Sequence, residues 1–324
     1  MAARPETTTG LQIVDLRRVH YELLLELLQE EVEAWRASLH WDFQPSADLL
    51  LRYVSTHALD GLAMIRDGSA IGYTYYITEQ RKGLIGDLYL RMSHRTAENE
   101  RALLGAVLDS MIRSPYINRI EAQLMMMRNP ARGELGGAPQ PQAFPRQFML
   151  ASLAGAPDLP AKKLPGRIAF ERWGAQLIDA TAALIAQVYR NHVDSRINDQ
   201  YRSQAGARRF LQNIVQYPGC GQFHQPGSWV AINSSTGDLL GVSLASFVAQ
   251  QVGHLTQICV SRNAKGTGLG YELMRRSMNS LAEAGAREIS LTVTRENTDA
   301  ISLYERVGFS AVRFFDALVW EGFL

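Results

Sequence analysis

The sequence contains, at residues 259–270, the stretch Cys259-Val260-Ser261-Arg262-Asn263-Ala264-Lys265-Gly266-Thr267-Gly268-Leu269-Gly270. Apolar periodicity predicts a strand over residues 254–260 and a helix over residues 267–284, so the glycines lie where a short loop enters a helix. Backbone N–H groups at a helix start lack intrahelical partners, and the macrodipole adds partial positive charge there. Glycine also lets a ligand approach the main chain closely. The stretch suits a phosphate or diphosphate, although its glycine content is equally compatible with an ordinary strand-to-helix turn.

Two other phosphate-binding patterns do not fit this stretch. A Walker loop that uses Lys265 needs glycine at positions 259 and 264, where the chain has Cys259 and Ala264. The dinucleotide-binding pattern G-x-G-x-x-G needs glycine at position 271, where the chain has Tyr271. These residues therefore argue against a nucleotide-dependent kinase or dehydrogenase.

A second stretch follows downstream and reads Asn297-Thr298-Asp299-Ala300-Ile301-Ser302-Leu303-Tyr304-Glu305-Arg306-Val307-Gly308-Phe309. Together the two stretches resemble the acyl-coenzyme A loop and the following segment of the GNAT N-acetyltransferase superfamily. The family patterns are Gln/Arg-x-x-Gly-x-Gly/Ala and Asn-x-x-Ala-x-x-Leu-Tyr-x-x-x-Gly-Phe. Lys265 departs from the first position, which puts the role of that side chain in doubt. The resemblance is specific over residues 228–315 and only topological for the N-terminal half.

The resemblance implies direct transfer of an acyl group from acetyl-CoA, the co-substrate, to an amine. The N–H groups of the loop would bind the diphosphate, and the main chain before it would pair with the pantetheine amides as an added strand would. The residues implied in cofactor binding are Ile258, Cys259, Val260, Lys265, Gly266, Thr267, Gly268, Leu269 and Gly270. Asn297 would contact pantetheine or substrate; the alternative is that it caps the helix that follows.

The resemblance also implies an acid and a base. Tyr304 would be the general acid, because a phenol with a reference pKa of about 10 protonates a leaving thiolate while itself staying neutral at pH 7. The alternative is a tyrosine packed in the core beside Leu303 and Phe309. His254 stands where several family members carry a base, and imidazole can accept a proton from an ammonium group. The alternative is a histidine with satisfied hydrogen bonds at a strand start.

A polar and aromatic segment, residues 189–201, joins two expected helices of the second half. In the family this region shapes the acceptor site, so the resemblance implies that Asp194, Asp199 and Tyr201 bind a cationic acceptor. A solvated loop is the alternative. The acceptor itself is not identified: a small-molecule amine, a peptide N-terminus or a lysine fits these residues.

Composition limits the class of protein further. The 324 residues favour two domains at roughly 150 residues each, and 33 Lys plus Arg balance 32 Asp plus Glu, so no large basic field favours nucleic acid. Cys220 and Cys259 are the only cysteines, which excludes a disulfide framework and a cysteine-based zinc site, and no metal is expected. With no signal-like start and no apolar run of about 18 residues, we expect a soluble, cytoplasmic protein without a membrane partner.

The two halves show the same order of expected elements: helix, helix, hairpin, strand, helix, strand. Residues 1–10 are expected to fray, the Gly- and Pro-rich residues 129–145 predict a loop, and further prolines place a domain boundary near residue 165. We therefore expect an α/β fold with mixed α+β sheets. It comprises two tandem GNAT-like domains, residues 11–164 and 165–324, each a mixed, mostly antiparallel sheet flanked by helices.

The first domain lacks the features of the second. Its corresponding junction, residues 90–100, has no glycine, and Glu98 and Glu100 oppose a diphosphate. We expect a degenerate copy and a single acetyl-CoA site in residues 165–324. The predicted function is N-acetyl transfer to a primary amine; the alternative is a non-catalytic acyl-CoA-binding or interaction protein. Neither the acyl chain preference nor the oligomeric state follows from the sequence.

Overall fold

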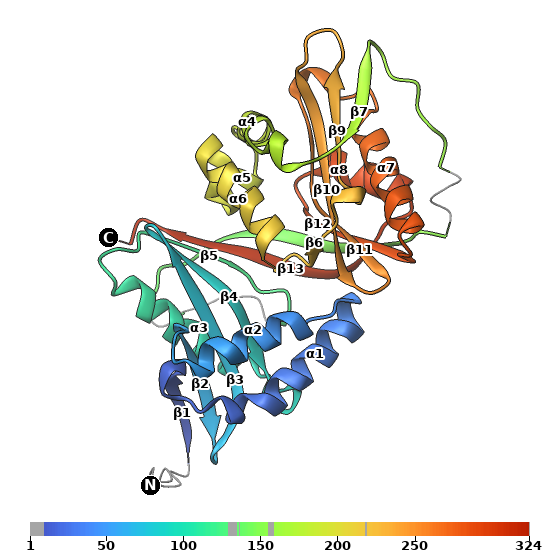
Figure 1. The fold of residues 1–324 in the computed structure, drawn as a ribbon. Helices are drawn as coiled ribbons and strands as arrows, with labels where there is room; N and C mark the ends of the chain where they lie inside the picture. The colour runs from blue at the N-terminus through green and yellow to red at the C-terminus, as the bar shows by residue number, and fades with distance from the viewer. Residues whose placement is uncertain (1–9, 129–134, 136, 155–158, 218, 324) are drawn as a thin grey trace. The chain divides into compact units, whose positions relative to one another are not determined.

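The computed structural model describes residues 10–128, 135, 137–154, 159–217 and 219–323. The chain forms two compact units (Figure 1). The first unit comprises Met1–Ala37, Phe43–Pro145 and Phe315–Leu324, and the second comprises Ser38–Asp42 and Arg146–Phe314. Residues 146–164 thus belong to the second unit and residues 315–324 to the first, whereas the sequence analysis divides the chain once, near residue 165.

The sheet of the first unit has the strand order β1-β2-β3-β4-β5-β13. Neighbouring strands run antiparallel except β4 and β5, which are parallel. The strands are β1 (Leu11–Asp15), β2 (Gly61–Arg66), β3 (Ser69–Glu79), β4 (Lys82–Leu90), β5 (Arg119–Gln123) and β13 (Ser310–Glu321). Asp67 and Gly68 connect β2 to β3 with φ of 49° and 78°, and this left-handed backbone is the reason why Asp-Gly predicts a tight hairpin.

Three helices accompany these strands. They are α1 (Leu25–Leu39), α2 (Gln44–Ser55) and α3 (Ala97–Ile112). The apolar side of α3 packs on the sheet, and the buried core there includes Leu103, Leu104, Val107, Leu108 and Met111. These are the residues that the helical periodicity of the sequence assigns to one side of α3.

The sheet of the second unit has the order β6-β12-β11-β10-β9-β7, and β8 pairs with β10. Only β11 and β12 are parallel among the described pairs. The strands are β6 (Gln142–Ser152), β7 (Ile168–Arg172), β8 (Gln222–Phe223), β9 (Trp229–Asn233), β10 (Leu239–Ala249), β11 (Val252–Val260) and β12 (Glu288–Thr294). Each unit is a mixed, mostly antiparallel sheet, so the predicted fold class is confirmed.

The helices of the second unit cover two faces of its sheet. They are α4 (Ile178–Val188), α5 (Asp194–Ile197), α6 (Gln204–Gln216), α7 (Leu269–Glu283) and α8 (Thr298–Arg306). Helices α4 and α6 pack against one set of strand side chains, which includes Val230 and Val242. Helix α7 packs against the alternate set, which includes Ala231 and Ala245. Two buried faces explain why the central strands are apolar almost throughout.

Two strands determine how the chain divides into units. Residues Arg146–Ser152 of β6 pair with β12, so they complete the sheet of the second unit. Residues Ala317–Glu321 of β13 pair with β5, so they complete the sheet of the first. The predicted loop is wrong over residues 142–145, which begin β6; most of its earlier part lies outside the described residues. Pro145 is tolerated because its pairing with β12 starts only at Arg146.

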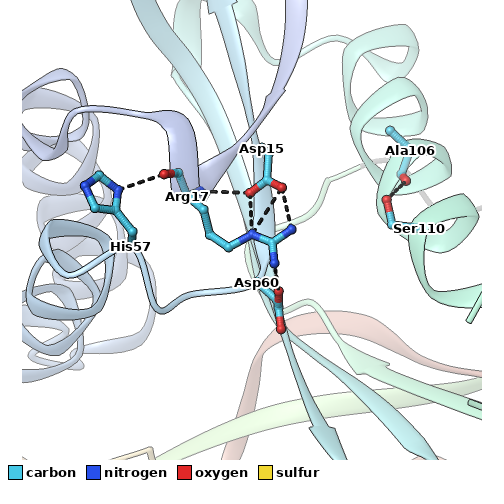
Figure 2. Close-up of polar contacts among 6 residues, drawn as sticks. All are labelled: Asp15, Arg17, His57, Asp60, Ala106 and Ser110. Atoms are coloured by element: carbon cyan, nitrogen blue, oxygen red, sulfur yellow. Dashed lines mark hydrogen bonds and ion pairs between the residues drawn. The ribbon is translucent and has the colours of Figure 1, made fainter. Parts of the chain in front are cut away.

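An arginine fixes the chain where β1 ends in the first unit (Figure 2). Arg17 contacts Asp15 at 2.6 Å and Asp60 at 3.2 Å, and its carbonyl oxygen lies 2.7 Å from Nδ1 of His57. The hydrogen bond from the Arg17 side chain is the main reason why the pKa of Asp15 lies below its ordinary value. In α3 of the same unit, the Ser110 hydroxyl donates to the carbonyl oxygen of Ala106 at 3.0 Å.

Two of the buried carboxyl groups in the first unit, Glu31 and Asp87, are neighbours. Glu31 of α1 accepts hydrogen bonds from the Tyr73 hydroxyl at 2.7 Å and from Nε1 of Trp35 at 3.2 Å. Burial, and then the neighbouring Asp87, raise the pKa of Glu31 well above its usual value. Two carboxylates this close cannot both ionise at low cost, so the pair retains a proton in the folded protein.

Replacing Glu31 by Gln is expected to reduce the loss of stability at high pH. The wild-type fold keeps a proton that the unfolded chain releases above the ordinary glutamate pKa of 4.5, so its free energy of unfolding falls as pH rises above that value. One proton corresponds to about 1.4 kcal/mol per pH unit. Urea unfolding of both proteins between pH 5 and pH 9 measures the slopes. Glu33→Gln, at an exposed position of α1, is the control, and equal slopes in all three proteins would contradict the shared proton.

Candidate functional site

A pocket of about 1160 Å³ opens in the second unit. It is lined by the end of β11, the loop before α7, the start of α7, one side of α8 and the segment 159–162. Typical small-molecule sites enclose roughly 300–1,000 Å³, so this pocket has room for an elongated ligand.

The loop before α7 leaves the start of that helix open. Gly266 has φ of 75°, and Gly268, the N-cap, has φ of 94° and makes no side-chain capping bond. The Thr267 hydroxyl donates to the carbonyl oxygen of Ala264 at 2.7 Å, which closes the loop on itself. Glu272 makes the first helical bond, to Gly268 at 3.1 Å, and the N–H of Leu269 makes only a long bond of 3.4 Å to the Thr267 hydroxyl, so the N–H groups at the start of α7 can still turn to a ligand. The pocket therefore ends at a partial positive charge.

The strand before the loop offers a second set of backbone groups. The parallel pairing of β11 with β12 is described from Val252 to Leu255, while β11 continues to Val260 beside β10. Ile258, Cys259 and Val260 of this continuation line the pocket. An extended chain with amide groups can pair with such a strand edge.

The side chain of Tyr304, on α8, lines the same pocket and is mostly buried. Its ring packs on Phe309 with the centroids 5.9 Å apart. Burial, and then the nearby Asp194 and Cys259, raise the pKa of Tyr304 above its usual value. The phenol therefore stays neutral at physiological pH and can act as a hydrogen-bond or proton donor. Asn297, also in the lining, accepts from the backbone N–H of Ala300 and is the N-cap of α8, as the structural alternative predicts.

The only thiol in the lining belongs to Cys259. Burial raises its pKa to about 12, although a hydrogen bond with Gln257 acts in the opposite direction. A thiol with this pKa is protonated near neutral pH, and the thiolate is the nucleophilic form of cysteine. Cys259 is thus unsuited to form a covalent intermediate.

Polar side chains gather near this thiol, at the strand end of the pocket. Nε2 of Gln257 donates to the hydroxyl of Tyr189 at 2.9 Å, and the Tyr201 hydroxyl donates to Oε1 of Gln257 at 3.3 Å. The Asp194 carboxylate accepts from the Thr294 hydroxyl and lies 3.6 Å from Nδ1 of His192. A carboxylate, an imidazole and tyrosine hydroxyls in one place suit a small cationic or polar group.

His254 does not line the pocket. Its Nδ1 lies 2.9 Å from the Ser290 hydroxyl, and its ring contacts Trp41 and Phe148 with centroids 5.1 and 6.2 Å away. Burial lowers the pKa of His254 to about 3. This environment matches the structural alternative, a histidine satisfied within the core, and gives no support to a role as a base.

Most of the other predicted residues lie together. Those in the pocket lining are Ile258, Cys259, Val260, Lys265, Gly266, Gly268, Leu269, Gly270, Asn297 and Tyr304. Thr267, Asp194, Asp199 and Tyr201 lie outside the lining, although Asp194 and Tyr201 bond to residues beside it. Sequence reasoning missed Lys162, Tyr189 and His192. The last two belong to the polar segment already singled out, whereas Lys162 lies in a proline-rich stretch that gives no local signal of binding.

The matching junction in the first unit is closed by side chains. The Thr96 hydroxyl accepts from the backbone N–H of Asn99 at 3.1 Å, so α3 has its own cap. The Arg95 guanidinium donates to the carbonyl oxygen of Leu90 at 2.8 Å and lies 4.6 Å from the ring centroid of Tyr89. The end of β4 and the start of α3 are therefore occupied by the protein's own groups.

Two other kinds of site were sought in the part of the chain that the structure describes. No cluster of three or more His, Cys, Asp or Glu side chains there is arranged to hold a metal ion. No helix there has the length and apolar character needed to cross a membrane.

Comparison with known proteins identifies similar chains. Residues 193–309 match the family described as Acetyltransferase (GNAT) family. A mycothiol acetyltransferase from Gordonia bronchialis is 27% identical over 156 residues, which cover 48% of this chain and 47% of that protein. A streptothricin acetyltransferase from Streptomyces lavendulae is 34% identical over 29% of this chain and 50% of its own length. These matches span about half of each curated relative.

The fold as a whole also has a solved counterpart. A tandem GNAT protein from the clavulanic acid biosynthesis pathway aligns with a TM-score of 0.64, covering 97% of this chain and 98% of its own at 15% identity. At this identity the likeness concerns the fold alone.

Replacing His254 by Gln is expected to flatten the acid dependence of stability. The folded protein keeps this imidazole neutral down to a pKa of about 3, whereas the unfolded chain takes up a proton below 6.5. The free energy of unfolding therefore falls as pH drops through this window, by about 1.4 kcal/mol per pH unit. Urea unfolding at pH 7.5, 5.5 and 4.5 measures the effect. His20→Gln, at an exposed position, should retain the wild-type slope, and a wild-type slope in His254→Gln would refute the buried neutral state.

Proposed function

We propose that this chain, which contains a GNAT-family acetyltransferase domain, transfers an acetyl group from acetyl-CoA to a primary amine of a small molecule or peptide. The observation that carries the proposal is one pocket that joins the open start of α7, the end of β11 beyond its pairing with β12 and the neutral phenol of Tyr304. An anion site, a strand edge and a proton donor share its lining. This combination matches a ligand with a diphosphate, an amide-containing arm and a thioester.

The residues present fit acetyl-CoA. N–H groups at the start of α7 and in the loop with Gly266 and Gly268 would hold the diphosphate, and the main chain of Ile258–Val260 would pair with the pantetheine amides. Bound there, acetyl-CoA supplies a thioester as acyl donor. The side chain of Lys265 lies in the lining, so it is available to the phosphates even though the family pattern has Gln or Arg at this position.

Tyr304 is the proposed general acid. The ammonium first gives one proton to solvent. The free amine nitrogen then forms a bond to the acetyl carbonyl carbon while the carbon–sulfur bond breaks, and the departing sulfur takes the proton of the Tyr304 phenol, so that coenzyme A leaves as a thiol. The nitrogen, now part of the amide, loses its second proton through solvent to the phenolate, which restores the phenol. Direct attack is favoured because the one thiol in the lining, Cys259, is protonated and buried.

The acceptor amine is proposed to bind beside Asp194 and His192. An alkyl ammonium group has a reference pKa of about 10.4, so it reaches the site charged, and a carboxylate stabilises it. Asp194 is oriented by Thr294 and lies close enough to Tyr304 to raise the pKa of that phenol. Tyr201 would form one wall through Gln257, while nothing places Asp199 beside the pocket.

Tyr304→Phe is expected to reduce kcat by about a hundredfold or more, because general acid catalysis contributes on the order of 10²–10⁴. The affinity for acetyl-CoA should change by less than about twofold, since Phe retains the packing on Phe309. Release of free thiol with a panel of primary amines measures kcat, and calorimetry measures binding. Tyr217→Phe, at an exposed position, is the control.

Two outcomes of this experiment would count against the proposal. Equal turnover in Tyr304→Phe would remove the phenol from the chemistry. Tight binding of acetyl-CoA with no turnover on any amine would favour the non-catalytic acyl-CoA-binding alternative.

Calorimetric titration is expected to show one acetyl-CoA site per chain. The first unit caps α3 with Thr96 and covers the end of β4 with Arg95, so only the second unit has an open junction. Gly268→Asp should abolish binding, because it adds a carboxylate at the start of α7. Gly237→Asp is a matched control, since Gly237 also has a positive φ of 79° but lies in the turn between β9 and β10. Two equivalent sites, or binding retained in Gly268→Asp, would contradict the assignment.

A further inference from the structure

The segment 159–162 is fastened to the first turn of α7. The Tyr271 hydroxyl donates to the carbonyl oxygen of Pro160 at 2.8 Å. The backbone N–H of Lys162 donates to Oε2 of Glu272 at 3.3 Å. Leu159, Pro160, Ala161 and Lys162 all line the pocket. This segment precedes the residues that match the family, 193–309, so the family match assigns it no role.

The side chain of Lys162 lies directly against the N-cap glycine of α7. A Cβ atom built on Gly268 would come within 2.5 Å of Cδ, 2.7 Å of Cε and 2.9 Å of Nζ of this lysine. The ammonium group of this exposed lysine thus lies within reach of the N–H groups at the start of α7. Gly268 is needed for its left-handed backbone conformation, since the flexible end of Lys162 could move aside for a Cβ atom.

The charges at this point are unbalanced. A cation at the positive end of a helix is unfavourable, and acidic groups are preferred there. The nearest carboxylate, Glu272, is already bonded to Arg275 at 2.8 Å and to Arg276 at 3.0 Å. Within the described residues, the ammonium of Lys162 has no carboxylate partner. An anion bound at the start of α7 would satisfy the ammonium and the N–H groups together.

We propose that Lys162 binds a phosphate group of acyl-CoA and that the segment 159–162 forms one wall of the phosphate site. The inference rests on the proposed function and adds a binding residue from outside the glycine-rich loop. Its ammonium supplies charge-assisted hydrogen bonds, while the loop supplies neutral N–H donors. Its partner is a phosphate of the diphosphate or the ribose 3′-phosphate, which share this chemistry.

Calorimetry on the full chain tests the proposal with Lys162→Ala, Lys162→Arg and Lys163→Ala. Lys163 is the adjacent exposed lysine and does not line the pocket, so it is the matched control. Lys162→Ala should bind acetyl-CoA about tenfold more weakly, as expected for the loss of one charge-assisted hydrogen bond at a partly solvated site. Lys162→Arg should restore most of the affinity, and Lys163→Ala should bind as the wild type does.

Two truncated ligands locate the contact. S-acetylpantetheine lacks the diphosphate, so its binding should not differ between wild type and Lys162→Ala. If Lys162→Ala binds dephospho-CoA about tenfold more weakly than the wild type does, Lys162 contacts the diphosphate. If the two proteins bind dephospho-CoA with equal affinity, Lys162 contacts the ribose 3′-phosphate. Either result supports the proposal. Unchanged affinity of Lys162→Ala for acetyl-CoA, or an equal loss for S-acetylpantetheine, would overturn it. If the wild type itself does not bind acetyl-CoA, the proposed function fails instead.

Discussion

Open backbone N–H groups at the start of α7 are the feature on which the site depends. They stay open because Gly268, in a left-handed conformation, brings no side chain to cap them, and because the Thr267 hydroxyl donates to Ala264 and accepts only a long bond of 3.4 Å from the Leu269 N–H. The same loop follows β11, whose described pairing with β12 ends at Leu255. The edge of β11 beyond that residue therefore ends beside a partial positive charge. Tyr304, from the helix after β12, lines the same pocket. One strand-loop-helix junction thus sets the positions of all three features.

The two units show how little is needed to close such a junction. In the first unit a threonine cap takes an N–H group of α3, and an arginine covers the last carbonyl group of β4. Both sheets have the same mixed pairing, with one parallel pair next to the junction. A capping hydroxyl and one guanidinium therefore distinguish a closed junction from an open one on the same scaffold.

Local sequence patterns predicted the helices and strands well, but they could not predict contacts between residues that lie far apart in the sequence. The expected strand 254–260 and helix 267–284 agree closely with β11 and α7, because apolar periodicity and the glycines between them mark both. His254 shows the limit. Alternation along a regular strand puts residues 254, 256, 258 and 260 on one face, but the pairing of β10 with β11 shifts register between Leu255 and Gln257. Such a bulge moves the following side chains to the other face, and no local signal in the sequence marks it. Lys162 was not predicted for a related reason. The segment 159–162 is far from α7 in the sequence and contacts this helix only in the folded chain.

The path of β13 has a consequence for how the protein forms. The first unit needs residues Ala317–Glu321 to pair with β5, yet these follow the whole of the second unit in the chain. During synthesis, domains generally fold as they leave the ribosome, starting from the N-terminus. Here the sheet of the first unit remains with β5 exposed along one edge until the whole of the second unit has been translated. The first unit is therefore the first to be synthesised and the last to complete its sheet. Until then a chaperone can bind the exposed edge of β5.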